Sequence, residues 1–185
     1  MGFIYITGGE KRGHKIYTKK DNLATRPTPS IMREALFNII DVKGRNFFDG
    51  FAGFGTVGLE ALSRGAKGVV FVESDKKNVE IIRRNLDKLS FFNRATIIKK
   101  DINIAVSDLK GREPFDYIFL GPPYKNLSIL RSLVPKLSMI LRQEGNIIIQ
   151  YPVNQDLFDF SKFGIILLKR KKYGSNILLF YKIRS

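Results

Sequence analysis

Three glycines shortly after residue 50 have the spacing of a loop that binds a nucleotide-like ligand. Gly53, Gly55 and Gly58 fit the pattern G-x-G-x-x-G. Apolar residues precede the loop and helix-forming residues follow it, which is the context that this pattern needs. Glycines there let the backbone turn sharply and approach a ligand closely. We therefore predict a bound ligand against this loop; the alternative is a tight strand-to-helix turn without a ligand.

Three carboxylates at predicted strand ends narrow the class of ligand. Glu73 lies 18 residues after Gly55, where a carboxylate can accept hydrogen bonds from both hydroxyls of a ribose. Asp49 closes the strand before the loop, which suits a positively charged amino-acid end better than a pyrophosphate. Asp101 follows the third strand, where it can bind an adenine amine. The alternative roles are helix capping for Asp49 and Asp101, and a solvated side chain for Glu73.

The segment Gly121-Pro122-Pro123-Tyr124 follows another apolar strand. Its two prolines fix the backbone and leave carbonyls without competing donors. Ligands of open α/β sheets bind at the carboxyl ends of strands, so we expect this segment beside the ligand of the glycine loop. A rigid acceptor next to an aromatic ring suits a planar base with an exocyclic amine, stacked on Tyr124. These four residues are the predicted catalytic segment.

Alternating strands and helices must position these motifs. Strands are predicted over residues 3–7, 14–18, 45–49, 68–73, 95–99, 116–120, 145–151, 165–171 and 176–183. Helices are predicted over 30–41, 56–64, 76–89, 103–109 and 127–141, the last kinked or broken at Pro135. The expected fold is α/β: a seven-stranded, mostly parallel Rossmann-like sheet with helices on both faces and a C-terminal antiparallel hairpin. A small N-terminal β-hairpin and helix extend it.

Composition excludes several kinds of site. The chain has 185 residues, no cysteine and one histidine, so thiolate zinc sites, iron–sulfur clusters and cysteine nucleophiles are excluded, and we expect no metal. The length favours one main domain, predicted over 29–185 after a basic extension over 1–28. The apolar runs are only strand-length, so we expect no membrane segment. The first residues lack a signal-peptide pattern, so we expect a cytoplasmic protein.

The charge is large and unevenly distributed. The formal net charge is +15, and the stretch from Lys162 to Ser185 carries seven basic residues and no acidic one. The first 30 residues carry six basic residues against two acidic ones. This excess indicates a polyanionic partner held by two cationic flanks. The alternative is that the charge only aids solubility.

Several segments together resemble one enzyme family. They are ITGGEKRGHKI, RPTPSIMREALFNII, FFDGFAGFGTVGLEALSRGAKGVVFVESD, IIKKD, FDYIFLGPPY and KRKKYGSNILLFY. Over almost its whole length the chain is similar to class I S-adenosylmethionine-dependent methyltransferases. Within them it resembles the RsmD family, which methylates the 2-amino group of a guanine in small-subunit (16S) ribosomal RNA. The segment RPT…REALFNI followed by the glycine loop is the specific part of this resemblance.

The resemblance implies partners and site residues. S-adenosylmethionine is expected at Asp49, Phe51, Gly53, Gly55, Gly58, Glu73 and Asp101. Small-subunit ribosomal RNA or a ribosomal particle of a bacterium is the expected substrate, bound by a monomer. The expected RNA contacts are Lys11, Arg12, Arg26, Arg33, Lys171 and Lys172. Arg26 and Arg33 have the alternative of pairing with carboxylates, and residues 169–172 that of a solvated face.

One departure from the family affects the predicted chemistry. The family has Asp or Asn where this chain has Gly121. That side chain would accept a hydrogen bond from the target amine, and losing one aligned acceptor costs roughly 3 kcal/mol at the transition state, about a hundredfold in rate. The backbone carbonyls of Gly121 and Pro122 remain as acceptors. They are expected to draw the amine lone pair out of the ring plane, towards the methyl group.

Three other functions stay open at this point. An adenine amine methyltransferase would use a Pro-Pro-Tyr segment in the same way, because adenine also presents an exocyclic amine. An NAD-dependent oxidoreductase shares the glycine loop, although Asp49 and the proline segment argue against it. A weakened or inactive RNA-binding relative is the third alternative, and Gly121 is the residue that favours it.

Overall fold

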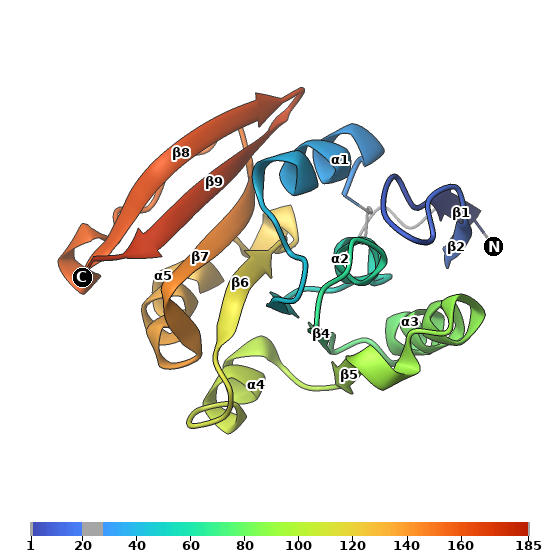
Figure 1. Ribbon diagram of the computed structural model, residues 1–185. Coiled ribbons are helices and arrows are strands. Elements are labelled where there is room, and N and C mark those ends of the chain that lie inside the picture. Colours follow the sequence, from blue (N-terminus) through green and yellow to red (C-terminus); the bar gives the residue numbers. More distant parts are fainter. Residues whose placement is uncertain (1, 20–27, 185) are drawn as a thin grey trace.

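The computed structural model describes residues 2–19 and 28–184 (Figure 1). Its strands are β1 (Gly2–Tyr5), β2 (Lys15–Thr18), β3 (Asn46–Asp49), β4 (Gly68–Val72), β5 (Ala95–Ile98), β6 (Phe115–Leu120), β7 (Leu141–Pro152), β8 (Ile165–Tyr173) and β9 (Asn176–Ile183). Its α-helices are α1 (Ser30–Ile39), α2 (Thr56–Ser63), α3 (Lys76–Leu89), α4 (Ile102–Asp108) and α5 (Ile129–Leu133). Four short 3-10 helices are η1 (Phe92–Arg94), η2 (Tyr124–Asn126), η3 (Val134–Met139) and η4 (Ser161–Phe163). Within the described ranges, every helix is too short or too polar to cross a membrane.

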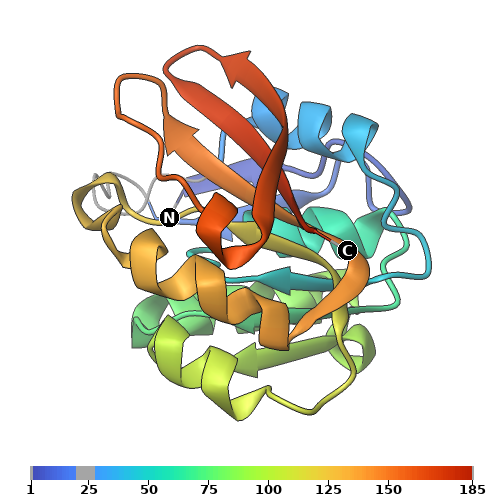
Figure 2. The same ribbon diagram turned by 90° about the vertical axis from the view of Figure 1, so that its left-hand side faces the viewer.

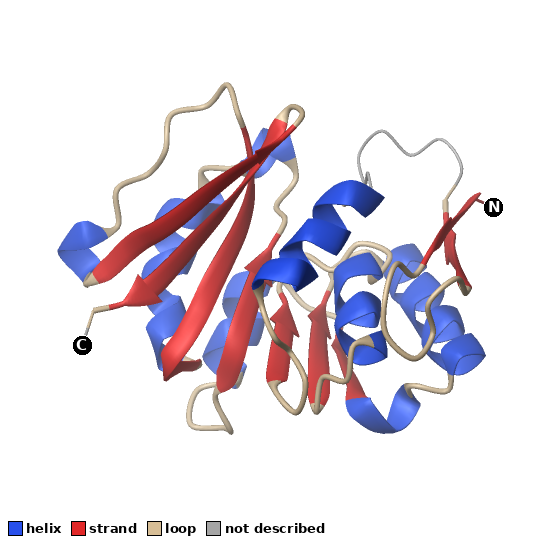
Figure 3. Ribbon diagram, turned by 45° about the horizontal axis from the view of Figure 1, so that its top comes forward, coloured by secondary structure: helices blue, strands red, loops and turns tan. Residues whose placement is uncertain are grey.

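Seven strands form one sheet in the order β5-β4-β3-β6-β7-β9-β8 (Figure 3). The first five pair in parallel, and β9 pairs antiparallel with both β7 and β8. The hairpin of β8 and β9 forms one edge of the molecule (Figures 1 and 2). The predicted seven-stranded, mostly parallel sheet with a terminal antiparallel hairpin is confirmed.

Two apolar layers cover the faces of the sheet. Helices α1, α2 and α3 pack on one face and α4 and α5 on the other. Alternation along β7 illustrates the division, because Ile148 belongs to the first layer while Ile147 and Ile149 belong to the second. The strands therefore read as continuous apolar runs, as expected for a sheet buried on both faces.

The segment before β7 differs from its prediction. Instead of one helix over 127–141, the chain forms α5 and then the 3-10 helix η3, which has Pro135 near its start. The strand β7 begins at Leu141, four residues before the predicted start, because Leu141 already pairs with Phe115. The register then shifts before Tyr117 pairs with Asn146. Such an irregularity leaves no clear periodic signal in the sequence.

The N-terminal hairpin packs on the helical layer of the main sheet. Ile6 and Ile16 are buried in the same apolar cluster as α2 and α3. The side chain of Asn85 on α3 accepts from the Tyr17 N–H (2.7 Å) and donates to the Tyr17 carbonyl (3.0 Å). The loop between β1 and β2 contacts Ser63 at the C-terminal end of α2, where the Glu10 N–H donates to the Ser63 carbonyl.

Candidate functional site

A cleft of about 960 Å³ lies at the carboxyl ends of the central strands. Its lining comes from the segments that follow β3, β4, β5 and β6, together with Thr28, Gln150 and Asn176. The strands β3 and β6 are neighbours although they are distant in sequence, and the strand order reverses between them. This is the switch point at which open α/β sheets bind ligands. The predicted glycine loop and proline segment therefore face the same cleft.

The glycine loop forms the turn from β3 into α2. Gly55 has a φ of +78°, a left-handed conformation that favours glycine. A Cβ on Gly58 would lie 2.2 Å from a ring atom of Phe71 on β4, so only glycine lets α2 pack this closely on the sheet. Neither Gly55 nor Gly58 lines the cleft, whereas Phe51 and Gly53 do. Two of the predicted cofactor contacts thus shape the wall from behind rather than lining it.

Asp49 is a buried carboxylate at the end of β3. It is 1 % exposed and lines the cleft. One oxygen accepts from the Gly58 N–H in the first turn of α2, with 2.9 Å between N and O. Burial raises the pKa of Asp49 to about 7, against the lowering effect of the Gly58 N–H, and the nearby charge of Glu73 adds to the rise. Among the residues described, Asp49 has no ion pair with Lys or Arg.

Glu73 and Asp101 lie on the rim of the same cleft. Glu73 accepts hydrogen bonds from the N–H groups of Gly53 and Asp75, both at 2.8 Å between N and O. Asp101 is exposed and caps α4, where it accepts from the Asn103 N–H at 2.8 Å. Asp49 and Asp101 therefore both bond to the first turn of a helix and both line the cleft. Each of these two carboxylates can therefore stabilise the start of a helix and also face a ligand in the cleft.

The proline segment leaves β6 and forms the opposite wall. Pro122 is buried, whereas Pro123 and Tyr124 are exposed. The Tyr124 hydroxyl donates to Oδ1 of Asn176 at the start of β9, and this bond holds a side chain that is 54 % exposed. Its ring is thus fixed at one end and open to a stacking partner. A Cβ on Gly121 would lie 3.2 Å from the Phe119 ring, so the neighbour would have to shift by only a few tenths of an ångström.

Three polar residues of this wall were not predicted as site residues from the sequence. Thr28, Gln150 and Asn176 form a hydrogen-bonded chain behind Gly121 that ends at Tyr124. Thr28 precedes α1, and Asn176 follows the turn between β8 and β9. Gln150 carried a usable signal, because it is a polar residue after three consecutive isoleucines near the carboxyl end of a buried strand.

One predicted RNA contact is wrong. The Arg33 side chain is fully buried, because its guanidinium bridges three parts of the chain. It pairs with Glu60 on α2 (Nε to Oε2, 3.3 Å) and donates to the carbonyls of Thr28 (3.0 Å) and Tyr5 (2.6 Å). It therefore cannot reach RNA and instead holds the N-terminal hairpin on the domain. Arg26 lies outside the described residues.

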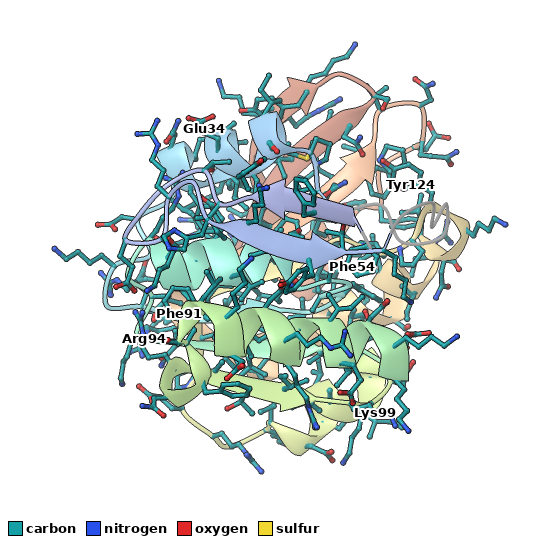
Figure 4. All side chains as sticks on the ribbon, turned by 90° about the vertical axis from the view of Figure 1, so that its right-hand side faces the viewer. Glu34, Phe54, Phe91, Arg94, Lys99 and Tyr124 are labelled. Atoms are coloured by element: carbon teal, nitrogen blue, oxygen red, sulfur yellow. The ribbon has the colours of Figure 1, made fainter. Side chains whose placement is uncertain are left out.

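The other predicted contacts are spread over two regions. Lys11 is half-buried over the ring of Phe91 (5.9 Å), and Arg12 is exposed beside it. This loop packs at the C-terminal end of α2, away from the cleft, and Figure 4 shows Phe91 and Tyr124 at opposite sides of the view. Lys171 and Lys172 are exposed on β8. They pair with the second and third residues of β9, next to Asn176 in the cleft wall.

The carboxylates of the cleft are not grouped for metal binding. Within residues 2–19 and 28–184, no group of three or more His, Asp and Glu side chains is placed to hold a metal ion.

Comparison with known proteins gives consistent matches over most of the chain. The family model described as "Conserved hypothetical protein 95" matches residues 4–182. "Putative rRNA methyltransferase YlbH" of Bacillus subtilis is 31% identical, covering 97% of this chain and 99% of its own. "Ribosomal RNA small subunit methyltransferase D" of Buchnera aphidicola is 33% identical, covering 84% and 85%. The solved structure "Putative methyltransferase yhhF" of Escherichia coli superposes with a TM-score of 0.81 at 27% identity, covering 99% of each chain.

Proposed function

The chain belongs to the family described as "Conserved hypothetical protein 95", and from this premise we propose that it transfers a methyl group from S-adenosylmethionine to the 2-amino group of a guanine in small-subunit ribosomal RNA. Both relatives described above carry the name of a ribosomal RNA methyltransferase, and the one from Buchnera aphidicola is named for the small subunit. The observation that carries the proposal is the meeting of Asp49, Glu73 and the segment from Gly121 to Tyr124 in one cleft. We expect the protein to act in the bacterial cytoplasm.

The residues of the first wall fit S-adenosylmethionine. Asp49 is a buried carboxylate without a cationic partner among the described residues, and the ligand carries both an ammonium and a sulfonium charge. Glu73 follows β4 directly and lines the cleft, where its oxygens can accept from ribose hydroxyls. Asp101 lies farther along the rim, where it can accept from the adenine amine. Phe51 and Gly53 supply the surface between these carboxylates.

The second wall positions the base. Tyr124 presents an exposed ring for stacking, and its hydroxyl is held by Asn176. One of the backbone carbonyls of Gly121 and Pro122 accepts a hydrogen bond from the amine and helps to draw its lone pair out of the ring plane. When bound, S-adenosylmethionine supplies a methyl group on a sulfonium, and the C–S electron pair stays on sulfur as the N–C bond forms. The protein mainly aligns the two reactants, and such alignment is worth many powers of ten in effective molarity.

The surroundings of the cleft suit an RNA substrate. Lys171 and Lys172 are exposed on β8 next to the cleft wall, and Arg12 adds a distant contact. The target guanine must be unpaired or flipped out to reach Tyr124. Cations around the cleft then hold the phosphates on either side of the flipped nucleotide.

Methyl transfer to unmodified ribosomal RNA tests the proposal. Purified protein is incubated with radiolabelled S-adenosylmethionine and either naked small-subunit RNA or small-subunit particles that lack the modification. We expect label in one of these substrates and N2-methylguanosine among the nucleosides identified by mass spectrometry. Comparison of the two substrates shows whether the enzyme acts before or after assembly.

Two other outcomes would contradict the proposal in different ways. N6-methyladenosine as the product would show that the cleft takes the other base with an exocyclic amine. Tight RNA binding without methyl transfer to any substrate would instead favour a non-catalytic RNA-binding relative.

A further inference from the structure

We propose that the side-chain carbonyl of Gln150 is the acceptor for the target amine at the position where Gly121 has no side chain to offer. This inference rests on the proposed methyl transfer to a base amine and deepens it by naming a residue that contacts the substrate. Within the proline segment, Pro122 and Pro123 carry no polar side-chain atom, and the Tyr124 hydroxyl already donates to Asn176. A polar side chain at this place must therefore come from another strand.

The sheet register brings Gln150 to the side of Gly121. The strands β6 and β7 are parallel neighbours, and their last pair is Leu120 with Ile149. Gly121 and Gln150 are the next residues of the two chains, and alternation directs both to the face that carries Phe119 and Ile148. Accordingly, Oε1 of Gln150 lies 3.8 Å from the position of a Cβ built on Gly121. The Gln150 amide therefore lies close to where the side chain of a larger residue at position 121 would be.

Hydrogen bonds fix the direction of the Gln150 amide. The Thr28 hydroxyl donates to Oε1 (2.8 Å), and Nε2 donates to Oδ1 of Asn176 (3.5 Å). The same Asn176 oxygen accepts from the Tyr124 hydroxyl, so the base-stacking ring and the amide are held by one group. A carbonyl oxygen has two acceptor sites. Thr28 uses one of them, and the second is available to a ligand because Gln150 is only half-buried and lines the cleft.

This geometry gives Gln150 a defined part in the transfer. One amine hydrogen bonds to Oε1 of Gln150 and the other to a backbone carbonyl of the proline segment, so the nitrogen lone pair points away from both. The lone pair forms the new N–C bond while the C–S pair remains on sulfur. The methylated nitrogen then releases one proton to water in the open cleft. Gln150 takes no proton in this scheme, because a neutral amide is a very weak base, and its part is alignment.

The substitution Gln150→Met tests this role, because it keeps the length of the side chain and removes the acceptor. Steady-state methyl transfer to the RNA substrate should show kcat lower by about a hundredfold. The KM for RNA and the Kd for S-adenosylmethionine should change by about twofold or less, since the main interactions of both ligands remain. Gln143→Met is the matched control, because Gln143 is exposed near the other end of the same strand. It should leave kcat and the melting temperature unchanged.

Two further variants distinguish lost alignment from lost packing. Gln150→Glu retains an acceptor oxygen and should keep at least about a tenth of the wild-type kcat. Gly121→Asn in the Gln150→Met background places a carbonyl oxygen beside the amine from the other strand, and should raise kcat at least about tenfold over Gln150→Met. The room beside Gly121 allows this substitution with a small shift of Phe119.

The outcomes separate this inference from the function on which it rests. Active wild-type protein with an equally active Gln150→Met variant would overturn the role of Gln150 and leave the methyltransferase function intact. A loss in Gln150→Met that Gly121→Asn does not rescue, together with a lower melting temperature, would likewise overturn it, because packing would then explain the loss. Wild-type protein that methylates no RNA would contradict the proposed function itself.

Discussion

Two buried carboxylates on either side of the same turn, Glu60 and Asp49, have opposite surroundings. Glu60 on α2 is fully buried and pairs with Arg33 (3.3 Å) and Arg64 (3.0 Å), and it also accepts from the Thr7 N–H and hydroxyl. Asp49 is equally buried but accepts one backbone N–H, from Gly58, and has no cationic partner among the described residues.

The contrast separates charges that hold the fold from a charge that we propose is paired by a bound ligand. A buried ion is expensive unless it is paired and hydrogen-bonded. The chain meets this requirement for Glu60 with its own arginines, which tie the N-terminal hairpin to α1 and α2. For Asp49 it does not, and the pKa rises to about 7 because of burial. A perturbed carboxylate facing a cleft is typical of a functional site.

Removing the cation on the structural side should have the largest effect. Arg33→Met leaves the buried Glu60 with Arg64 as its one cationic partner among the described residues and frees the carbonyls of Tyr5 and Thr28. The free energy of unfolding should fall by about 3–5 kcal/mol, the cost of breaking a buried ion pair. Urea denaturation followed by circular dichroism measures it, with the exposed Arg83→Met as control. A loss below about 1 kcal/mol would show that this pair is not what holds the hairpin.

The matching change on the functional side is Asp49→Asn. The amide oxygen can still accept from Gly58, but the charge that faces the ligand is gone. Affinity for S-adenosylmethionine, measured by calorimetry, should fall about 10–100-fold, as expected when one charge-assisted hydrogen bond is removed. The free energy of unfolding should not fall, in contrast to Arg33→Met. Asp87→Asn on the exposed side of α3 is the control, and equal affinities in all three proteins would mean that the ligand does not meet Asp49.

The raised pKa of Asp49 predicts a smaller, pH-dependent effect. Only the ionised carboxylate attracts a cation, so affinity for S-adenosylmethionine should rise about tenfold between pH 6 and pH 8 for a group that titrates near 7. The affinity of Asp49→Asn, measured in the same buffers, corrects for the titration of other groups, including those of the ligand. The ratio of the wild-type affinity to the Asp49→Asn affinity should rise over this pH range.

The same pKa fixes the sign of the effect on folding. A carboxyl whose pKa is higher in the native state binds more protons there than in the unfolded chain, so its contribution to stability is lost as pH rises from about 4 to 7. The unfolding free energy of the wild type should therefore decline relative to Asp49→Asn over this range. A parallel course of the two curves would place the pKa of Asp49 near its ordinary value.

The sequence is sufficient for the sheet and for the cleft at its carboxyl ends. Every strand of the main sheet can be located from apolar runs and from the turn residues that end them, because each of these signals is local in the sequence. The start of β7 is the exception, since Leu141 joins the strand through pairing with Phe115 across an irregular register. That pairing depends on residues distant in sequence, which no local periodicity records.

The contacts between side chains could be predicted less well than the positions of the motifs at the strand ends. Arg33 is a charged residue on a predicted amphipathic helix, a type of residue that is usually exposed. Only the packing of the hairpin against α2 reveals its pairing with Glu60. Gln150 likewise gains its significance from Gly121 on the neighbouring strand and from Thr28, 122 residues away. Both examples show that a partner is set by topology, whereas the position of a motif at a strand end is set by the strand itself.

The smallest expected effect concerns paired and unpaired charges on the surface. Lys67 forms an ion pair with Glu113 (2.9 Å), whereas Lys171 and Lys172 on β8, next to the cleft wall, have no ion pair among the described residues. If an unpaired charge marks a ligand here as well, Lys171→Ser with Lys172→Ser should weaken RNA binding a few-fold. It should also reduce the slope of log affinity against log salt by about 0.7 for each phosphate of a single strand that is no longer neutralised. Lys67→Ser with Lys110→Ser removes the same charge from residues outside the cleft and should change the slope less. Equal changes in both double variants would show that total charge alone, rather than the position of the cations, governs RNA binding.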